Sequence, residues 1–194
     1  MARLLEPFAG NRAESAAHRL ITHFGGLGRA LNATPAQLER ALGDDQDLVA
    51  KILAARNLFE AALHEKLSHS TVSAADPDYR RYLRLTIGKS PVECLHATYV
   101  TPQWGYLADD RIATGTPAQV EMNLRFFLGR AFDVGAHGVL LAHNHPSGSA
   151  EPSAADIAIT QRIARLTQSV GVLLLDHLII GADAIVSMKE RKLL

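Results

Sequence analysis

The sequence predicts an α/β (α+β) protein in two parts, in which a small all-α unit precedes a domain of alternating strands and helices. Residues 1–67 contain only Ala-rich amphipathic helical runs. Residues 68–78 are polar and include a Pro turn, which is typical of a linker. From residue 79, strand and helix patterns alternate. We therefore expect a helical unit over 1–67, a linker over 68–78 and a mixed α/β domain over 79–194.

Three helical runs are expected in the first unit, over residues 14–23, 35–42 and 48–67. Thr34-Pro35 is a strong start signal, because Thr is a favoured N-cap and Pro is favoured at the first helical position. Apolar residues recur near helical spacing along the last run, so we expect them to form the core of a small bundle.

The second unit is expected to begin with a short helix and a three-stranded meander, and then to alternate helices with strands. Its predicted elements are a helix over 79–86, strands over 93–100, 104–108 and 111–116, a helix over 118–132, a strand over 138–142, a helix over 154–170, and strands over 172–180 and 184–188.

Composition limits the classes of protein to consider. The chain has 194 residues, 47% of them hydrophobic, and a single cysteine, Cys94, so no internal disulfide can form. No run of about 18 apolar residues is available to span a membrane, and Glu6 and Pro7 stand where a signal peptide would continue its apolar run. We expect a cytoplasmic protein without membrane contact.

Charge disfavours nucleic acid as the main partner. The chain has 20 Lys and Arg against 20 Asp and Glu, whereas binding through phosphates needs clustered positive charge. In the helical unit, the turn Leu42-Gly43-Asp44-Asp45 places carboxylates where a DNA-binding hairpin would meet phosphate. Nucleic-acid binding is expected to be weak or absent.

A metal-site pattern follows the predicted strand over 138–142. His143 and His145 are two residues apart, so both project to the same side of an extended chain. A turn containing Pro and Gly separates them from Asp156. Two imidazoles and one carboxylate match the three protein ligands of a catalytic zinc site, which leaves a fourth position for water.

Ser153 and Asp156 also have the spacing of a capping box, which by itself predicts only a helix start. Its occurrence shortly after a His-x-His motif favours a metal ligand. Other zinc chemistries fit less well, because the sequence has no His-Glu-x-x-His motif and its single cysteine cannot supply the Cys-x-x-Cys of nucleobase deaminases.

The pattern His143-x-His145-Pro146, Ser153-x-x-Asp156 and the later run Leu175–Gly181 resembles the JAMM (MPN/JAB) metallopeptidase domain of RadC-like bacterial proteins. The resemblance covers roughly residues 80–194. The first unit resembles, less closely, the helix-hairpin-helix unit that precedes this domain. The family implies a cytidine-deaminase-like fold with a mixed sheet flanked by helices, one Zn²⁺ ion, and a protein or peptide substrate.

The resemblance also implies residue roles. His143, His145 and Asp156 would be the metal ligands, and Ser153 would donate to the developing oxyanion. A glutamate on an upstream strand would activate water as general base, and the corresponding position here, five residues before Gly115, is Asp110.

Three hypotheses stay open. Asp110, whose side chain is one methylene shorter than that of glutamate, separates the first two, and the third rests on the helical unit. The first is a zinc-dependent peptidase or isopeptidase, the second a binding module of the same fold without activity, and the third a DNA-repair-associated protein. Glu93 is expected to lie on the surface. Asp176-His177 is expected either to orient a ligand histidine or to stabilise the sheet as a buried pair. The oligomeric state stays open, a homo-oligomer included.

Overall fold

A computed structural model describes residues 1–31, 33–43, 45–115 and 124–194. The chain divides into two compact units, Met1–Ala62 and Leu63–Leu194. The division falls within helix α5 (Gln46–Ser68), slightly before the end of the predicted helical unit. In the described part of the chain, every helix is too short or too polar to cross a membrane.

The first unit is entirely helical, as its Ala-rich sequence predicts. Its core is built from small and aliphatic side chains, including Ala16, Leu20 and Leu38. Thr34 and Gln37 form a capping box at the start of one helix, with a main-chain to side-chain hydrogen bond in each direction. The elements before α5 are α1 (Ala2–Ala9), η1 (Gly10–Arg12), α2 (Ala13–Phe24), α3 (Leu27–Leu31) and α4 (Pro35–Leu42).

The second unit contains a five-stranded mixed sheet in the order β2-β1-β3-β4-β5. The pair β3 and β4 is parallel, and the other neighbours are antiparallel. This arrangement confirms the predicted mixed α/β class. The strands are β1 (Cys94–Val100), β2 (Tyr106–Thr114), β3 (Gly138–Asn144), β4 (Leu173–Ile180) and β5 (Ile185–Ser187), and the helices are α6 (Pro77–Thr86), α7 (Leu124–Asp133) and α8 (Ala154–Ser169).

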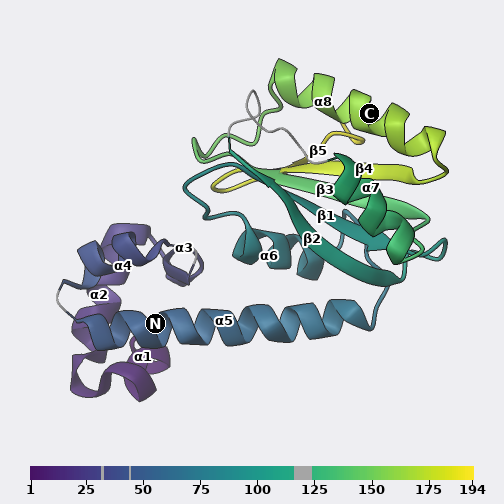
Figure 1. Cartoon of the computed structure of the whole chain (residues 1–194). Coiled ribbons are helices and arrows are strands. Elements are labelled where there is room, and N and C mark those ends of the chain that lie inside the picture. The colour runs from purple at the N-terminus through teal and green to yellow at the C-terminus, as the bar shows by residue number, and fades with distance from the viewer. Residues whose placement is uncertain (32, 44, 116–123) are drawn as a thin grey trace. The chain divides into compact units, whose positions relative to one another are not determined.

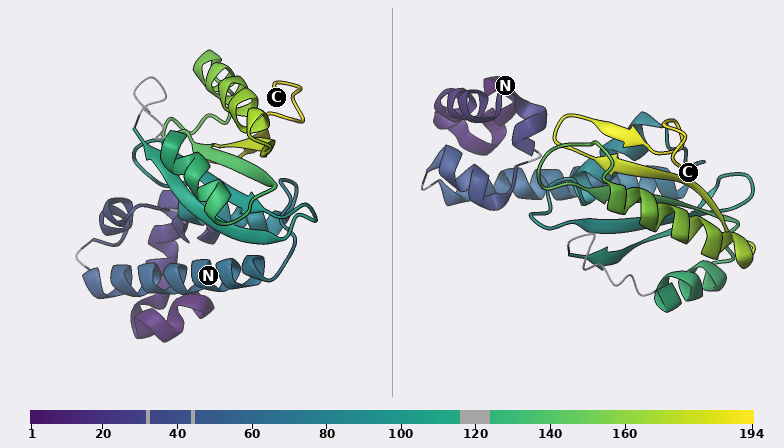
Figure 2. Two further views of the ribbon diagram at one scale, coloured as in Figure 1. Left: turned by 45° about the vertical axis from the view of Figure 1, so that its right-hand side comes forward. Right: turned by 90° about the horizontal axis from the view of Figure 1, so that it is seen from above.

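Helices cover both faces of this sheet (Figures 1 and 2). Residues that alternate along a strand point to opposite faces. Leu140 of β3 packs in the cluster that contains Leu83 of α6, whereas Leu141 packs with Phe127 of α7 and Ile163 of α8. The strand β3 is therefore buried on both sides, which explains its unbroken apolar sequence.

The predicted meander differs from the structure at residues 104–116. The two strands expected at 104–108 and 111–116 form the single strand β2, which passes through Asp109 and Asp110. Tyr82 donates a hydrogen bond to Asp109, and Arg130 donates one to Asp110. Two adjacent aspartates normally indicate a turn, but these partners allow them to lie within a strand.

The predicted linker and the predicted helix over 118–132 also differ from the structure. Within the expected linker 68–78, Val72 is fully buried in the second unit and donates its N–H to the main-chain oxygen of Trp104. The helix expected over 118–132 is observed from Leu124, and its predicted start lies outside the described residues.

Candidate metal centre

The structure brings His143, His145 and Asp156 together at one end of the sheet. His143 lies in β3, next to the last residue of that strand, and Asp156 lies in the first turn of α8. His145 follows the strand, but its N–H donates to the main-chain oxygen of Ile180, which extends the pairing of β3 with β4. A buried strand end and a helix start therefore hold the three side chains.

The three side chains lie close enough together to share one ion. His143 Nε2 lies 2.8 Å from His145 Nε2 and 3.2 Å from Asp156 Oδ1. His145 Nε2 lies 3.3 Å from Asp156 Oδ2. Zinc bonds of ~2.0–2.1 Å in tetrahedral geometry place neighbouring ligand atoms about 3.3 Å apart. Two imidazole nitrogens and a carboxylate are also the donor set that zinc prefers, so these residues fit the implied ion.

A main-chain contact fixes the ring of His145. Its Nδ1 lies 2.8 Å from the main-chain oxygen of Ser149, which can only accept a hydrogen bond. The proton of a neutral ring therefore sits on Nδ1, and Nε2 keeps its lone pair. This loop packs closely on the turn after β4, where a Cβ on Gly181 would lie 2.6 Å from the main-chain oxygen of Gly148. Only glycine fits at that position.

Asp156 is held as a carboxylate. Burial alone would raise its pKa, but the close contact with the His143 ring and the hydrogen bonds from Ser153 outweigh that effect and keep the pKa well below its usual range. The Ser153 hydroxyl lies 2.5 Å from Asp156 Oδ2, and the Ser153 N–H donates to the same oxygen at 2.8 Å. Ser153 thus caps α8 and orients this carboxylate.

The pair Asp176-His177 divides into two different roles. His177 contacts the metal centre, since its Nε2 lies 2.8 Å from His143 Nδ1. Burial lowers the pKa of His177 well below its usual value. Asp176 instead accepts hydrogen bonds from the Ser187 hydroxyl and the Lys189 N–H. It therefore connects the end of β5 and the residues that follow to β4.

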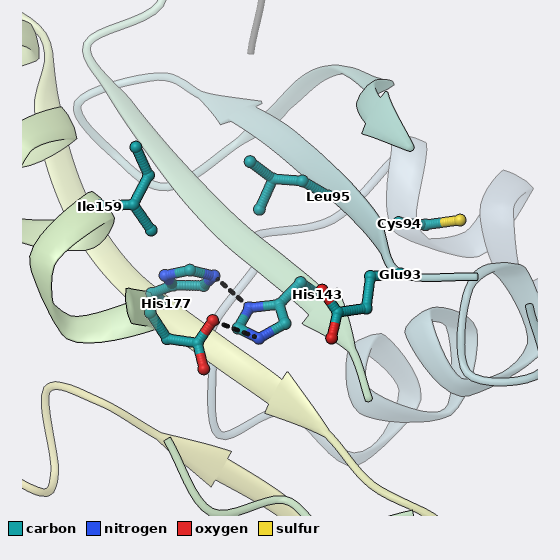
Figure 3. Close-up of a pocket in the computed structure, with 7 residues that line it drawn as sticks. Glu93, Cys94, Leu95, His143, Ile159 and His177 are labelled. Carbon is teal, nitrogen blue, oxygen red and sulfur yellow. Dashed lines mark hydrogen bonds and ion pairs between the residues drawn. The ribbon is translucent and has the colours of Figure 1, made fainter. Parts of the chain in front are cut away.

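Glu93 is a candidate functional residue that the sequence prediction placed on the surface. It immediately precedes β1 and lines a cavity of about 30 Å³ together with His143, Asp156 and His177. Figure 3 shows its carboxylate beside the His143 ring. Glu93 Oε2 is buried and has no hydrogen-bond partner among the described residues. Burial raises the pKa of this carboxyl, and the nearby histidines oppose that shift.

The cavity has the size to hold water beside Glu93. A site needs roughly 10–15 Å³ to accept one water molecule, together with polar partners, and this cavity has about 30 Å³. Leu95 and Ile159 form apolar walls, which strengthens electrostatic interactions between the polar groups.

Asn144 holds the segment that carries Glu93. This residue lies between the two histidines and is fully buried. Its Oδ1 accepts the N–H of Cys94 at 2.7 Å, and its Nδ2 donates to the main-chain oxygens of Ser90 and Val92. The side chain therefore points away from the candidate metal ligands and fixes the backbone on both sides of Glu93.

Asp110 is not brought to this site. Its carboxylate accepts a hydrogen bond from Arg130 at 2.9 Å. It pairs with Ala97 of β1, two residues along from Leu95, which pairs with His143. Two strand spacings and two residue rises place it roughly 12 Å from His143. Its register therefore gives no support to the predicted role of general base.

The signal that places Glu93 at the site is the pairing of β1 with β3. Antiparallel pairing of β1 with β3 puts the start of one strand beside the end of the other. The residue that precedes β1 therefore lies near His143, at the end of β3. The sequence does not reveal which strands pair. The position of Glu93 before a strand therefore does not by itself predict that it lies near His143.

Comparison with known proteins identifies the family of this chain. Residues 73–193 match the RadC-like JAB domain. The UPF0758 protein of Leptothrix cholodnii is 34% identical over 178 residues, which cover 92% of this chain and 80% of that protein. The UPF0758 protein of Variovorax paradoxus is 34% identical over 188 residues, which cover 96% of this chain and 83% of that protein. The chain belongs to the RadC-like JAB domain family.

Proposed function

We propose that this protein is a zinc-dependent hydrolase that cleaves an amide bond, of the peptide or isopeptide type, in a protein or peptide substrate. The observation that carries the proposal is a buried carboxylate oxygen of Glu93 beside His143, His145 and Asp156, which has no partner among the residues described. A zinc ion held by the three ligands would supply Lewis acidity and lower the pKa of a bound water.

Glu93 is the proposed general base in place of Asp110. Its raised pKa suits a group that must take a proton from water and return it to the leaving amine. Oε2 is the atom that accepts the proton, because it has no competing partner in the part of the chain that the structure describes.

Ser153 has two proposed roles that follow one another. Its hydroxyl has one proton, which is directed to Asp156 Oδ2. Donation to a developing oxyanion, as in the family mechanism, requires this proton to turn away from the carboxylate. Ser153 therefore orients a ligand before the reaction and acts as an oxyanion donor during it.

The hypothesis of an inactive binding module is not favoured. It depended on Asp110 as the sole candidate base, whereas Glu93 lies at the cavity. The third hypothesis, a protein acting on nucleic acid, has no further support. Near the start of α5, the Leu48 N–H and the Arg12 side chain already have Asp45 as their partner in place of a phosphate.

Zinc content and hydrolysis measured on the same preparations test the proposal. Wild type should copurify with or take up one zinc ion, and His143→Ala and Asp156→Ala should lose it. Peptides and isopeptide-linked peptides serve as substrates, because the sequence identifies no particular protein. Glu93→Gln should keep the zinc and lose activity about 10²–10⁴-fold.

Asp110→Asn is the matched control for Glu93→Gln, since both changes neutralise a carboxylate without altering its size. It should keep both zinc and activity. Hydrolysis that survives Glu93→Gln but not Asp110→Asn would restore the role first predicted for Asp110. A wild-type protein that binds no zinc would end the proposal.

A further inference from the structure

His143 and Asp156 are joined, on the side away from His145, by a buried chain of hydrogen bonds. His143 Nδ1 lies 2.8 Å from His177 Nε2 (Figure 3), and His177 Nδ1 lies 2.6 Å from the Thr160 hydroxyl. Thr160 Oγ1 lies 2.6 Å from the main-chain oxygen of Asp156. His177 and Thr160 are 1% and 0% exposed, so water does not compete for these contacts.

The main-chain oxygen of Asp156, the last group in this series of hydrogen bonds, determines where each proton lies. A main-chain oxygen can only accept, so the single hydroxyl proton of Thr160 is donated to Asp156. Thr160 Oγ1 then accepts from His177 Nδ1, and His177 Nε2 accepts from His143 Nδ1. A neutral imidazole carries one proton, so His143 Nε2 is left with the lone pair that faces His145 and Asp156.

The opposite direction would disable the site. If Thr160 donated to His177 Nδ1, the ring protons would occupy Nε2 of both His177 and His143, and His143 could not bind a metal. The other acceptor near Thr160 is Met188 Sδ at 3.4 Å, a weaker and more distant one than the main-chain oxygen.

We infer that His177 and Thr160 are positioning residues, which hold His143 in the one tautomer that binds a metal through Nε2 and couple it to the helical turn that carries Asp156. This inference rests on the proposed metal site. A purely structural role for the same contacts would affect folding stability but leave metal affinity and tautomers unchanged.

Zinc affinity, measured by competition with a chelator on the full chain, separates the two roles. His177→Leu should weaken zinc binding about 10–100-fold, as is usual when a partner of a ligand histidine is lost. His177→Gln restores an acceptor oxygen for His143 and should recover much of this loss. Thr160→Val should also bind zinc more weakly, whereas Thr160→Ser keeps the hydroxyl and should resemble wild type.

Thr167→Val is the matched control. Thr167 lies on the same helix, is also 0% exposed, and donates its hydroxyl to the main-chain oxygen of Ala164 at 3.2 Å. Thr167→Val removes a similar hydrogen bond and leaves the hydrogen bonds that link Asp156 to His143 intact. It should cost stability but leave zinc affinity at the wild-type value.

Nitrogen NMR of the zinc-loaded wild type gives a direct signature, and it decides the question even if His177→Leu does not fold. Both His143 and His177 should carry their proton on Nδ1. A proton on Nε2 of His177, or folded His177 and Thr160 variants that bind zinc as tightly as wild type, would overturn the inference and leave the metal site standing. Failure of the wild type to bind zinc would instead contradict the proposed function.

Discussion

Ser153 and Thr34 start their helices with the same capping box, but only Ser153 begins a helix that carries a proposed metal ligand. In both boxes the hydroxyl oxygen accepts an N–H of the first turn, and the third residue accepts the N–H of the cap. The Ser153 hydroxyl additionally approaches the carboxylate of Asp156. One residue therefore serves both helix formation and the metal centre.

Ser153→Ala and Thr34→Ala should have the same cost in stability and different effects on zinc. Each should destabilise its own unit by about 1 kcal/mol, the usual cost of losing a side-chain cap. Only Ser153→Ala should weaken zinc binding, because Asp156 loses a donor that orients it. Thermal unfolding and chelator competition measure the two quantities. Equal zinc affinity in both variants would show that the Ser153 hydroxyl does not orient Asp156.

Residues that are close in sequence were easier to predict than residues that pairing brings together. His143, His145 and Asp156 lie within one short segment, from the end of a strand to the first turn of the next helix, and the structure places them together. Glu93 reaches them only through the register of β1 with β3. No local pattern encodes that register, whereas Asp110 was predicted from its position before Gly115 alone.

At the scale of elements, β2 shows how tertiary contacts override local preference. Asp109 lies on the face of the sheet covered by α6, where Tyr82 donates to it at 2.6 Å and His96 lies 3.2 Å away. Burial would raise the pKa of Asp109, but these contacts outweigh it and lower the pKa. Local composition indicates a turn, and the partners that keep the strand continuous come from elsewhere in the chain.

Asp109→Asn should destabilise the second unit most at neutral pH. The folded-state pKa lies below the unfolded value of ~3.9, so the ionised carboxylate stabilises the fold above that pH and the contribution is lost as pH falls through the folded pKa. We expect a difference of about 1.5–3 kcal/mol at pH 7, typical of hydrogen bonds to a charged group.

Denaturant unfolding of wild type and Asp109→Asn between pH 7 and pH 3 measures this difference, which should narrow toward the acid end. Asp110→Asn is the control, because the ion pair with Arg130 is partly exposed and contributes about 1 kcal/mol or less. If the difference in unfolding free energy between wild type and Asp109→Asn does not change with pH, the charge of Asp109 does not stabilise the fold.

At the scale of the whole molecule, the two units have separate hydrophobic cores. The core of the first unit contains Leu38, and the second has two clusters, one on each face of the sheet. The division into a helical part and an α/β part followed from composition and periodicity. The position of the boundary within α5 did not, because a continuous helix carries no local signal where its packing partners change.

Core substitutions in the two units should therefore have separate effects. Leu38→Ala and Leu141→Ala each truncate a fully buried leucine and should cost about 2–5 kcal/mol. Leu38→Ala should reduce hydrogen-exchange protection in residues 1–62 only and leave zinc affinity unchanged. Leu141→Ala lies in β3, two residues before His143, and should reduce protection in the sheet and weaken zinc binding. Loss of protection in both units from Leu38→Ala would mean that the two cores unfold together.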